Sequence, residues 1–166
     1  MKAAILTLSD KGARGERVDA SGPALTSWLA GHGVETALTG IIPDEAEQIA
    51  AKLAEWADSG LYDLILTTGG TGVSPRDVTP DATLRVVERV IPGFGEQMRL
   101  KSMEKTPRAM ISRAIAGIRG TTLIINLPGS PRGAVENLEA VWPAVPHAVE
   151  KIQGDQSECA LPPHAH

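Results

Sequence analysis

The stretch DLILTTGGTGVSPRDVTPDAT, residues 63–83, decides the fold of this 166-residue chain. It opens with a short apolar run at residues 63–67, passes through three glycines within four residues and ends on an amphipathic segment. Two further apolar runs, residues 3–8 and 122–127, and a fourth candidate at residues 34–42 have the length of buried strands. Each is bounded by turn or helix signals, as expected for a sheet that is covered on both faces.

Amphipathic segments alternate with these runs. They cover residues 22–32, 44–58, 81–90, 133–141 and 146–152, with a further helical insert before the last strand. Thr79 is placed to cap the helix of residues 81–90, with Pro80 at its first position. This alternation predicts an α/β fold with a mostly parallel sheet. We expect one domain over residues 1–154 and a flexible tail over residues 155–166, because the tail has no apolar period.

Composition narrows the class of protein. A net charge of -4 and 3% aromatic residues argue against a nucleic-acid partner. No apolar run approaches the length of about 18 residues that a membrane helix needs, and no signal-peptide pattern follows Met1. The one cysteine, Cys159, allows no intramolecular disulfide. We therefore expect a cytoplasmic protein with no membrane partner.

The glycine loop is the first candidate site, since ligands of such folds bind beyond the carboxyl ends of the strands. Its glycines allow positive φ angles and close approach of the backbone to a ligand. Its amides can surround an anion, helped by the hydroxyls of Thr68, Thr71 and Ser74. A plain strand-to-helix turn explains GGTG alone equally well.

The loop matches neither of two common nucleotide motifs. No Gly-Lys-Ser/Thr follows, so it is not a Walker loop, and Pro75 stands where the dinucleotide fingerprint has its third glycine. Two carboxylates, Asp77 and Asp81, follow the loop. Carboxylates beside a phosphate site indicate a metal ion or a proton acceptor.

Three other junctions carry polar residues. Asp10 follows the first strand and is either a ligand contact or a turn residue. Asp44, with Glu47 three positions on, fits a helix-capping box, and a capping aspartate there also lies near the ligand edge. The segment NLPGSPRG, residues 126–133, offers amides at a helix start, a hydroxyl and a guanidinium, and is either an anion site or a stiff Pro/Gly turn. Two such loops favour a ligand with more than one phosphate.

Four blocks in order resemble the molybdopterin-binding family that includes MogA and the G domain of gephyrin. They are TTGGTG-x-x-x-RDVTPDAT (residues 67–83), PGFGEQMR (92–99), SRAIAGIRG (112–120) and LIINLPGSPRG (123–133). The resemblance implies a three-layer α/β/α sandwich, a homotrimer, and an enzyme that transfers AMP from ATP to molybdopterin, with Mg²⁺ as cofactor. Its partners would be molybdopterin, ATP and, further on, a molybdate-insertion enzyme.

The same resemblance assigns roles to residues. It makes Asp44 and Asp77 the catalytic carboxylates and the ligands of the Mg²⁺ that accompanies ATP. It places the pterin phosphate on the loop of residues 69–74. The other expected substrate contacts are Ser9, Asp10, Thr68, Gly69, Gly70, Thr71, Gly72, Ser74, Asp81, Ser112, Arg113, Asn126, Pro128, Gly129 and Ser130.

Alternative functions remain open at this point. A non-catalytic molybdopterin-binding scaffold or a MoaB-like protein would share the scaffold. The molybdate-inserting enzyme shares the GGTG pattern but needs further domains, for which 166 residues leave no room. Another nucleotide-processing enzyme could also use this fold, because fold alone does not determine function.

Overall fold

A six-stranded sheet forms the centre of the molecule in the computed structural model, which describes residues 1–156. The strands are β1 (Lys2–Leu8), β2 (Glu35–Ile42), β3 (Leu64–Thr68), β4 (Arg89–Val90), β5 (Ala116–Arg119) and β6 (Thr122–Leu127). Their order across the sheet is β2-β1-β3-β6-β5-β4. The strands β2, β1, β3 and β6 pair in parallel, and β5 is antiparallel to both of its neighbours. The predicted α/β class with a mostly parallel sheet is confirmed.

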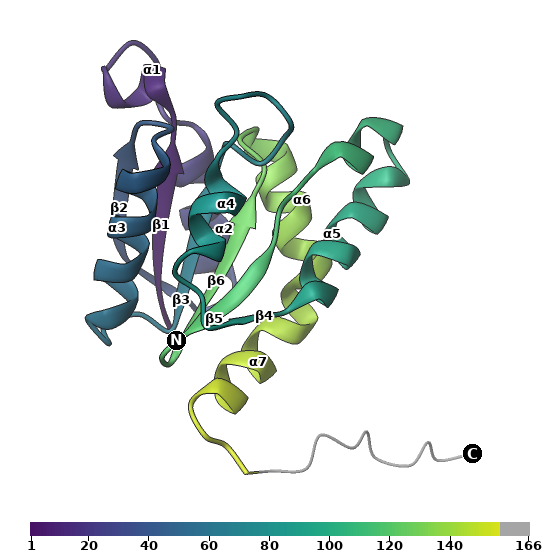
Figure 1. Ribbon diagram of the computed structural model, residues 1–166. Coiled ribbons are helices and arrows are strands. Elements are labelled where there is room, and N and C mark those ends of the chain that lie inside the picture. The colour runs from purple at the N-terminus through teal and green to yellow at the C-terminus, as the bar shows by residue number, and fades with distance from the viewer. Residues whose placement is uncertain (157–166) are drawn as a thin grey trace.

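Helices cover both faces of the sheet (Figure 1). One face packs against α2 (Ser21–Gly31), α5 (Pro92–Met103), α6 (Pro131–Val141) and α7 (Val145–Ile152), and the other against α3 (Ala46–Asp58) and α4 (Thr79–Leu84). Because successive side chains of a strand point to opposite faces, Ile5 belongs to the first of these cores and Leu6 to the second. The expected three-layer arrangement is therefore confirmed.

Short helices complete the described chain. They are α1 (Asp10–Ala13) directly after β1, and the 3-10 helices η1 (Pro107–Ile111) and η2 (Trp142–Ala144). Both α1 and the loop between β3 and α4 lie at the carboxyl ends of the parallel strands, at the top of Figure 1. This edge is the one at which the sequence predicts a ligand.

The helix predicted over residues 81–90 is wrong in its second half. The helix α4 ends at Leu84, and Arg89–Val90 forms the edge strand β4. The chain turns into the sheet here because β5 offers backbone partners: the N–H of Glu88 donates to the carbonyl oxygen of Ile118 at 2.8 Å. Sheet pairing with a distant segment thus overrides the local helical period.

The strand β5 was not predicted, because its four residues fall within the segment assigned to a helical insert. That segment does contain the helices α5 and η1, and β5 follows them. β5 and β6 form a hairpin, and Gly120 takes the positive φ of 53° that the tight turn requires. A glycine and a threonine between two apolar runs were the available signal.

Two predicted helix caps are also wrong. The N-cap of α4 is Val78, and the Thr79 hydroxyl donates instead to the carbonyl oxygen of Gly69 at 2.9 Å. The helix α3 begins at Ala46, after Glu45, and no side chain caps it. The Asp44 carboxylate binds another loop instead, so both polar side chains organise the ligand edge of the sheet.

The predicted boundary at residue 154 lies close to the end of the described chain. The helix α7 ends at Ile152, and Lys151 pairs with Asp155 at 2.9 Å. Most of the predicted flexible tail, residues 157–166 with Cys159, lies outside the described residues. Within residues 1–156 no helix combines the length and the apolar character that a membrane span requires.

Candidate functional site

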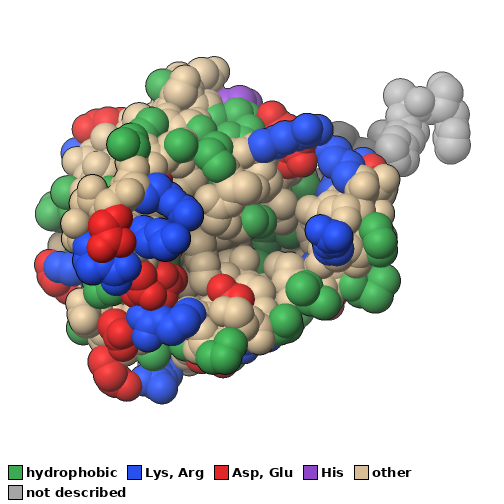
Figure 2. Space-filling model, turned by 90° about the horizontal axis from the view of Figure 1, so that it is seen from above, with side chains coloured by type: hydrophobic (Ala, Val, Ile, Leu, Met, Phe, Trp, Pro, Cys, Tyr) green, Lys and Arg blue, Asp and Glu red, His purple; other side chains and the backbone are tan. Residues whose placement is uncertain are grey.

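Two hollows meet at the carboxyl edge of the sheet, and each takes part of its wall from the glycine loop of residues 69–72. The larger, here called the carboxylate cleft, has a volume of about 520 Å³. Figure 2 views this edge from above and shows charged side chains gathered along one rim of a central depression. The cleft is lined by Thr7, Leu8, Ser9, Gly12, Arg17, Val18, Asp19, Ala20, Ser21, Asp44, Thr68, Gly69, Gly70, Arg76, Asp77, Gly129, Ser130 and Pro131.

The smaller hollow, here called the basic hollow, has a volume of about 320 Å³. Three cationic side chains line it: Arg99, Lys105 and Arg108. Twelve of the predicted site residues line one of these two hollows, and Asp10, Ser74, Asp81, Arg113 and Asn126 line neither. Ser9, Asp44, Thr68, Gly69, Gly70, Asp77, Gly129 and Ser130 line the carboxylate cleft, and Thr71, Gly72, Ser112 and Pro128 line the basic hollow.

The backbone of the glycine loop is fixed by its surroundings. Gly69 and Gly70 have φ angles of 110° and 63°, a region that side chains with a Cβ rarely adopt. A Cβ on Gly69 would lie 2.4 Å from the carbonyl oxygen of Leu8. These two glycines are thus required by the turn itself.

Several amides of the loop nevertheless remain available for an anion. The N–H of Gly69 donates to Leu127 and that of Ser74 to Asp77. Within residues 1–156, the amides of residues 70–73 have no hydrogen-bond partner. Consecutive unpartnered amides at the end of a strand form the kind of concavity that binds phosphate.

Asp77 closes the loop over Gly72. One of its carboxylate oxygens accepts the N–H of Ser74 at 2.8 Å. The same oxygen lies 2.8 Å from the position that a Cβ on Gly72 would take. Gly72 has no positive φ, so its lack of a side chain serves the placement of the Asp77 carboxylate rather than the turn.

Asp44 is held by a reciprocal pair of backbone contacts with Asp10. The N–H of Asp10 donates to the Asp44 carboxylate, and the N–H of Asp44 donates to the Asp10 carboxylate, both at 3.0 Å. Burial raises the pKa of the Asp44 carboxyl, and the N–H of Asp10 opposes part of that shift. The pair links the end of β1 to the segment before α3, which explains why Asp44 does not cap that helix.

Arg76 binds the Asp10 carboxylate and holds it in place. Its guanidinium donates to both carboxylate oxygens of Asp10, at 2.8 and 3.1 Å, and to Glu45 at 2.9 Å. Arg76 holds the pKa of the Asp10 carboxyl below its ordinary value. Asp10 does not line the cleft. Its role is to hold the segment that carries Asp44 in position. Arg76 belongs to the motif RDVTPDAT, and the sequence alone indicates no role for it.

Arg113 and Asp81 form a second brace. The Arg113 guanidinium binds both oxygens of Asp81, at 3.0 and 2.9 Å, and donates to the carbonyl oxygens of Gly72 and Asp77. Its own N–H donates to Thr71 at 2.8 Å. Arg113 also holds the pKa of the Asp81 carboxyl below its ordinary value. Neither residue lines a hollow, so this pair holds the shape of the glycine loop.

Three further predicted residues have structural contacts of their own. Asn126 is fully buried, and its side-chain amide donates to the hydroxyls of Thr67 and Thr83. The Ser74 hydroxyl accepts the N–H of Arg76 at 3.2 Å. Ser130 is the N-cap of α6 and accepts the N–H of Gly133 at 3.1 Å. Of the three, Ser130 alone also lines the carboxylate cleft.

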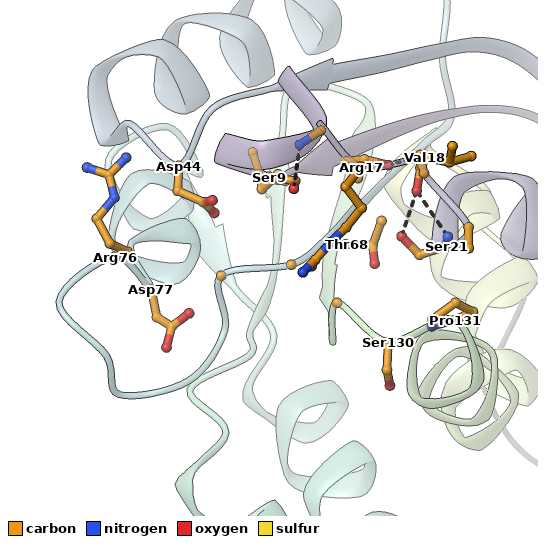
Figure 3. Close-up of a pocket in the computed structure, with 18 residues that line it drawn as sticks. Ser9, Arg17, Val18, Ser21, Asp44, Thr68, Arg76, Asp77, Ser130 and Pro131 are labelled. Atoms are coloured by element: carbon orange, nitrogen blue, oxygen red, sulfur yellow. Dashed lines mark hydrogen bonds between the residues drawn. The ribbon is translucent and has the colours of Figure 1, made fainter. Parts of the chain in front are cut away.

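Residues 17–21 line the cleft and were missed by sequence reasoning. Asp19 accepts the hydroxyl of Thr7 at 2.8 Å and the N–H groups of Ser21 and Gly22, so it binds the first amides of α2 and connects this helix to β1. The segment Asp-Ala-Ser-Gly-Pro, residues 19–23, before an apolar period is a recognisable helix start. Figure 3 shows Arg17 reaching from this segment into the cleft.

The carboxylates of the cleft suit a magnesium ion shared with a phosphate ligand. Among residues 1–156 there is no group of three or more Asp, Glu, His or Cys side chains arranged to hold a metal. Asp44 and Asp77 each keep one carboxylate oxygen without a hydrogen bond inside the described chain. Mg²⁺ is commonly bound by one or two carboxylates together with substrate phosphates, and this donor set fits that pattern.

Comparison with known proteins gives a consistent result. The family described as "Probable molybdopterin binding domain" matches residues 4–147. A molybdopterin adenylyltransferase of Helicobacter pylori is 42% identical over 153 residues, 91% of this chain and 87% of the relative. One of Escherichia coli K12 is 39% identical and covers 96% of this chain and 89% of its own length.

Solved structures agree with the sequence relatives. The molybdopterin biosynthesis enzyme MoaB of Thermus thermophilus superposes with a TM-score of 0.87 at 52% identity, over 93% of this chain and 97% of that one. A MogA structure gives a TM-score of 0.87 at 37% identity, over 92% and 99% of the two chains.

Proposed function

The chain belongs to the family of probable molybdopterin binding domains, and on that premise we propose that it transfers AMP from ATP to molybdopterin, giving adenylyl-molybdopterin and pyrophosphate. This reaction is a step in molybdenum cofactor biosynthesis. Relatives named molybdopterin adenylyltransferase match nearly the whole chain at 39–42% identity. The protein is therefore an enzyme of the nucleotidyltransferase class.

The observation that carries this function is the placement of Asp44 and Asp77 in a cleft bounded by the glycine loop, whose amides at residues 70–73 have no partner within residues 1–156. A protein that merely bound a phosphate would be hindered by two nearby carboxylates, because like charges repel. The carboxylates are useful when a cation is present or when charge is redistributed in a transition state. A non-catalytic scaffold is accordingly not favoured.

The chemistry joins two anions. The terminal phosphate of molybdopterin attacks the α-phosphorus of ATP, and the bond from that phosphorus to the bridging oxygen breaks with its electron pair going to pyrophosphate. The two phosphate groups repel each other, and the attacking oxygen must be aligned with the α-phosphorus. Positioning and electrostatic stabilisation therefore supply most of the catalysis. The amides of residues 70–73 would hold the attacking phosphate. No strong general base is needed, which agrees with a cleft whose lining contains no histidine.

Asp44 and Asp77 would hold the metal that accompanies ATP. When bound, Mg²⁺ would neutralise charge on the triphosphate. The chain's own contribution is to fix both carboxylates before substrate arrives, Asp44 through Asp10 and Asp77 through Ser74. The two arginine braces hold the loops that carry these contacts.

Three further features belong to the same proposal. The protein works as a homotrimer. The family resemblance supports this, as does an exposed apolar surface formed by Leu100 and Met103 of α5 and Met110 and Ile111 of η1. The reaction takes place in the cytoplasm, where ATP and Mg²⁺ are supplied. The adenylated product is then passed to a molybdate-insertion enzyme.

The direct test is mass spectrometry of molybdopterin incubated with the protein, ATP and Mg²⁺. We expect a product heavier by one AMP and a matching amount of pyrophosphate. Asp77→Asn keeps the size and hydrogen bonding of the side chain but removes its charge, so transfer should fall by about a hundredfold or more. Molybdopterin affinity should stay unchanged or improve slightly.

Asp81→Asn is the matched control, because Asp81 lies outside the cleft and pairs with Arg113. This variant should lower the melting temperature more than Asp77→Asn does. Wild-type protein that binds molybdopterin but forms no AMP adduct would overturn the proposed activity. Normal turnover in Asp77→Asn would remove Asp77 from the mechanism.

A further inference from the structure

Arg17 is a cation of the carboxylate cleft with no partner inside the described chain. Two arginines line this cleft. Arg76 already pairs with two carboxylates, those of Asp10 and Glu45. Arg17 makes no hydrogen bond or ion pair with any of residues 1–156, and Figure 3 shows its side chain extending into the cleft. An unpaired guanidinium in a cleft is available to a ligand.

The acidic side chains close to Arg17 in the sequence bind other groups, so the Arg17 guanidinium stays unpaired within residues 1–156. Arg14, the nearest other arginine, is neutralised by Glu16 at 2.8 Å. Gly15 takes a positive φ of 73°, which turns the chain after α1. Asp19, two residues beyond Arg17, is occupied by Thr7 and the start of α2. The two acidic side chains beside Arg17 in the sequence therefore already have partners.

The charges of the cleft indicate which ligand group Arg17 meets. Asp44 and Asp77 make their part of the wall negative, and the loop amides provide donors for a single phosphate. A triphosphate carries several negative charges, and a divalent ion neutralises only part of them. The remaining charge needs a cation, and a guanidinium donates two parallel hydrogen bonds to phosphate oxygens.

We propose that Arg17 binds the β- and γ-phosphates of ATP and then the pyrophosphate that leaves. This inference rests on the proposed function, because pyrophosphate is the leaving group of that reaction. When the bond between the α-phosphorus and the bridging oxygen breaks, the electron pair moves onto the pyrophosphate, and its new negative charge lies beside Arg17. Arg17 thus stabilises the leaving group and does not contact the pterin.

The test is calorimetric titration of pyrophosphate, ATP and AMP into wild type, Arg17→Ala and Arg17→Lys, with and without Mg²⁺. Arg17→Ala should weaken pyrophosphate and ATP binding by about tenfold or more. AMP lacks the two outer phosphates, so its affinity should stay within about twofold of wild type. Arg17→Lys keeps the charge but loses the planar fork and should recover part of the affinity.

Arg14→Ala is the matched control, because it removes an exposed arginine of the same segment that pairs with Glu16 and does not line the cleft. It should bind all three ligands as wild type does. Turnover adds a second readout: Arg17→Ala should raise the KM for ATP and leave the KM for molybdopterin unchanged.

Two results would overturn the assignment: unchanged pyrophosphate affinity in Arg17→Ala, or an equal loss for AMP and pyrophosphate. Failure of the proposed function would give a result different from both. If wild type formed no adenylyl-molybdopterin, the activity would be wrong, while the pyrophosphate titration would still decide whether Arg17 binds that group.

Discussion

The Asp44 carboxylate is partly buried and lines the carboxylate cleft. Its burial makes the free energy of folding depend on pH. Burial raises its pKa above the ordinary value of an aspartate. A carboxyl whose pKa is higher in the folded than in the unfolded protein favours folding when protonated. That stabilisation is fully present below the unfolded pKa and is lost as the pH rises through the folded pKa. At neutral pH the ionised Asp44 therefore opposes folding.

Asp44→Asn should separate function from stability. The asparagine can still accept the N–H of Asp10 through its side-chain oxygen, but it carries no charge. At neutral pH we expect a melting temperature equal to or above that of wild type, and AMP transfer lower by about a hundredfold or more. The stability difference should shrink as the pH falls and wild-type Asp44 becomes protonated.

Thermal unfolding without nucleotide, measured from neutral to acidic pH, checks this prediction together with a turnover assay. A variant that is much less stable than wild type at neutral pH would show that the charged form of Asp44 supports the fold. Unimpaired turnover would exclude Asp44 from the chemistry.

The single residues of the site were predictable to different degrees. Asp44 and Asp77 follow strands that end at one edge, and their motif resembles a known family, so both were found. Asp10, Asp81 and Arg113 were expected as substrate contacts, but their bracing role was not predicted, because Arg76 lies 66 residues from Asp10 and Arg113 lies 32 residues from Asp81. Such ion pairs cannot be read from the local sequence, because they join residues that only the folded chain brings together.

The glycine loop between β3 and α4 assigns different tasks to neighbouring glycines. Gly69 has a φ of 110° and approaches the carbonyl oxygen of Leu8 so closely that a Cβ would lie at 2.4 Å. Gly72 has no positive φ, and an added Cβ would lie 2.8 Å from a carboxylate oxygen of Asp77. The first glycine serves the fold, and the second serves the placement of a carboxylate.

Gly69→Ala and Gly72→Ala should therefore fail in different ways. Gly69→Ala adds backbone strain and a clash with a strand, so we expect a loss of about 2–4 kcal/mol in the free energy of unfolding. Gly72→Ala should keep nearly all of the stability but displace Asp77 and reduce AMP transfer. Denaturant unfolding and turnover of the two variants check this contrast. A strongly destabilised Gly72→Ala would show that this glycine also serves the turn.

Whole elements were predicted where their hydrophobic period was long and local. The strands β1, β3 and β6 and the helices α2, α3, α6 and α7 lie within a few residues of the predicted ranges. The strands β4 and β5 were missed because they have two and four residues, too few to show a period. They exist because each completes the other's backbone hydrogen bonds beside β6.

The molecule presents an apolar surface on α5 and η1, beside the basic hollow. Leu100 and Met103 of α5 and Met110 and Ile111 of η1 are exposed by 58%, 36%, 67% and 55%. Contiguous exposed apolar side chains commonly mark an interface with another protein. A homotrimer requires each chain to bury such a surface against its neighbours.

Light scattering at micromolar concentration should return three times the chain mass of 17.4 kDa. The double variant Leu100→Glu and Met110→Glu places charges on the apolar surface, and burying unpaired charges is costly. We expect this variant to be a folded monomer, with an unchanged circular dichroism spectrum. Leu61→Glu is the matched control, since Leu61 is also exposed, by 63%, but follows α3 at a distance in the fold from η1.

The possible outcomes test two statements separately: that the protein is a trimer, and that its subunits contact each other through α5 and η1. A wild-type monomer at these concentrations would refute the trimer. A wild-type trimer that persists in the double variant would keep the oligomer but assign its interface to another surface. Loss of the trimer in Leu61→Glu as well would mean that charge alone disperses the assembly. Only a trimer that survives Leu61→Glu and dissociates in the double variant places the subunit contact on α5 and η1.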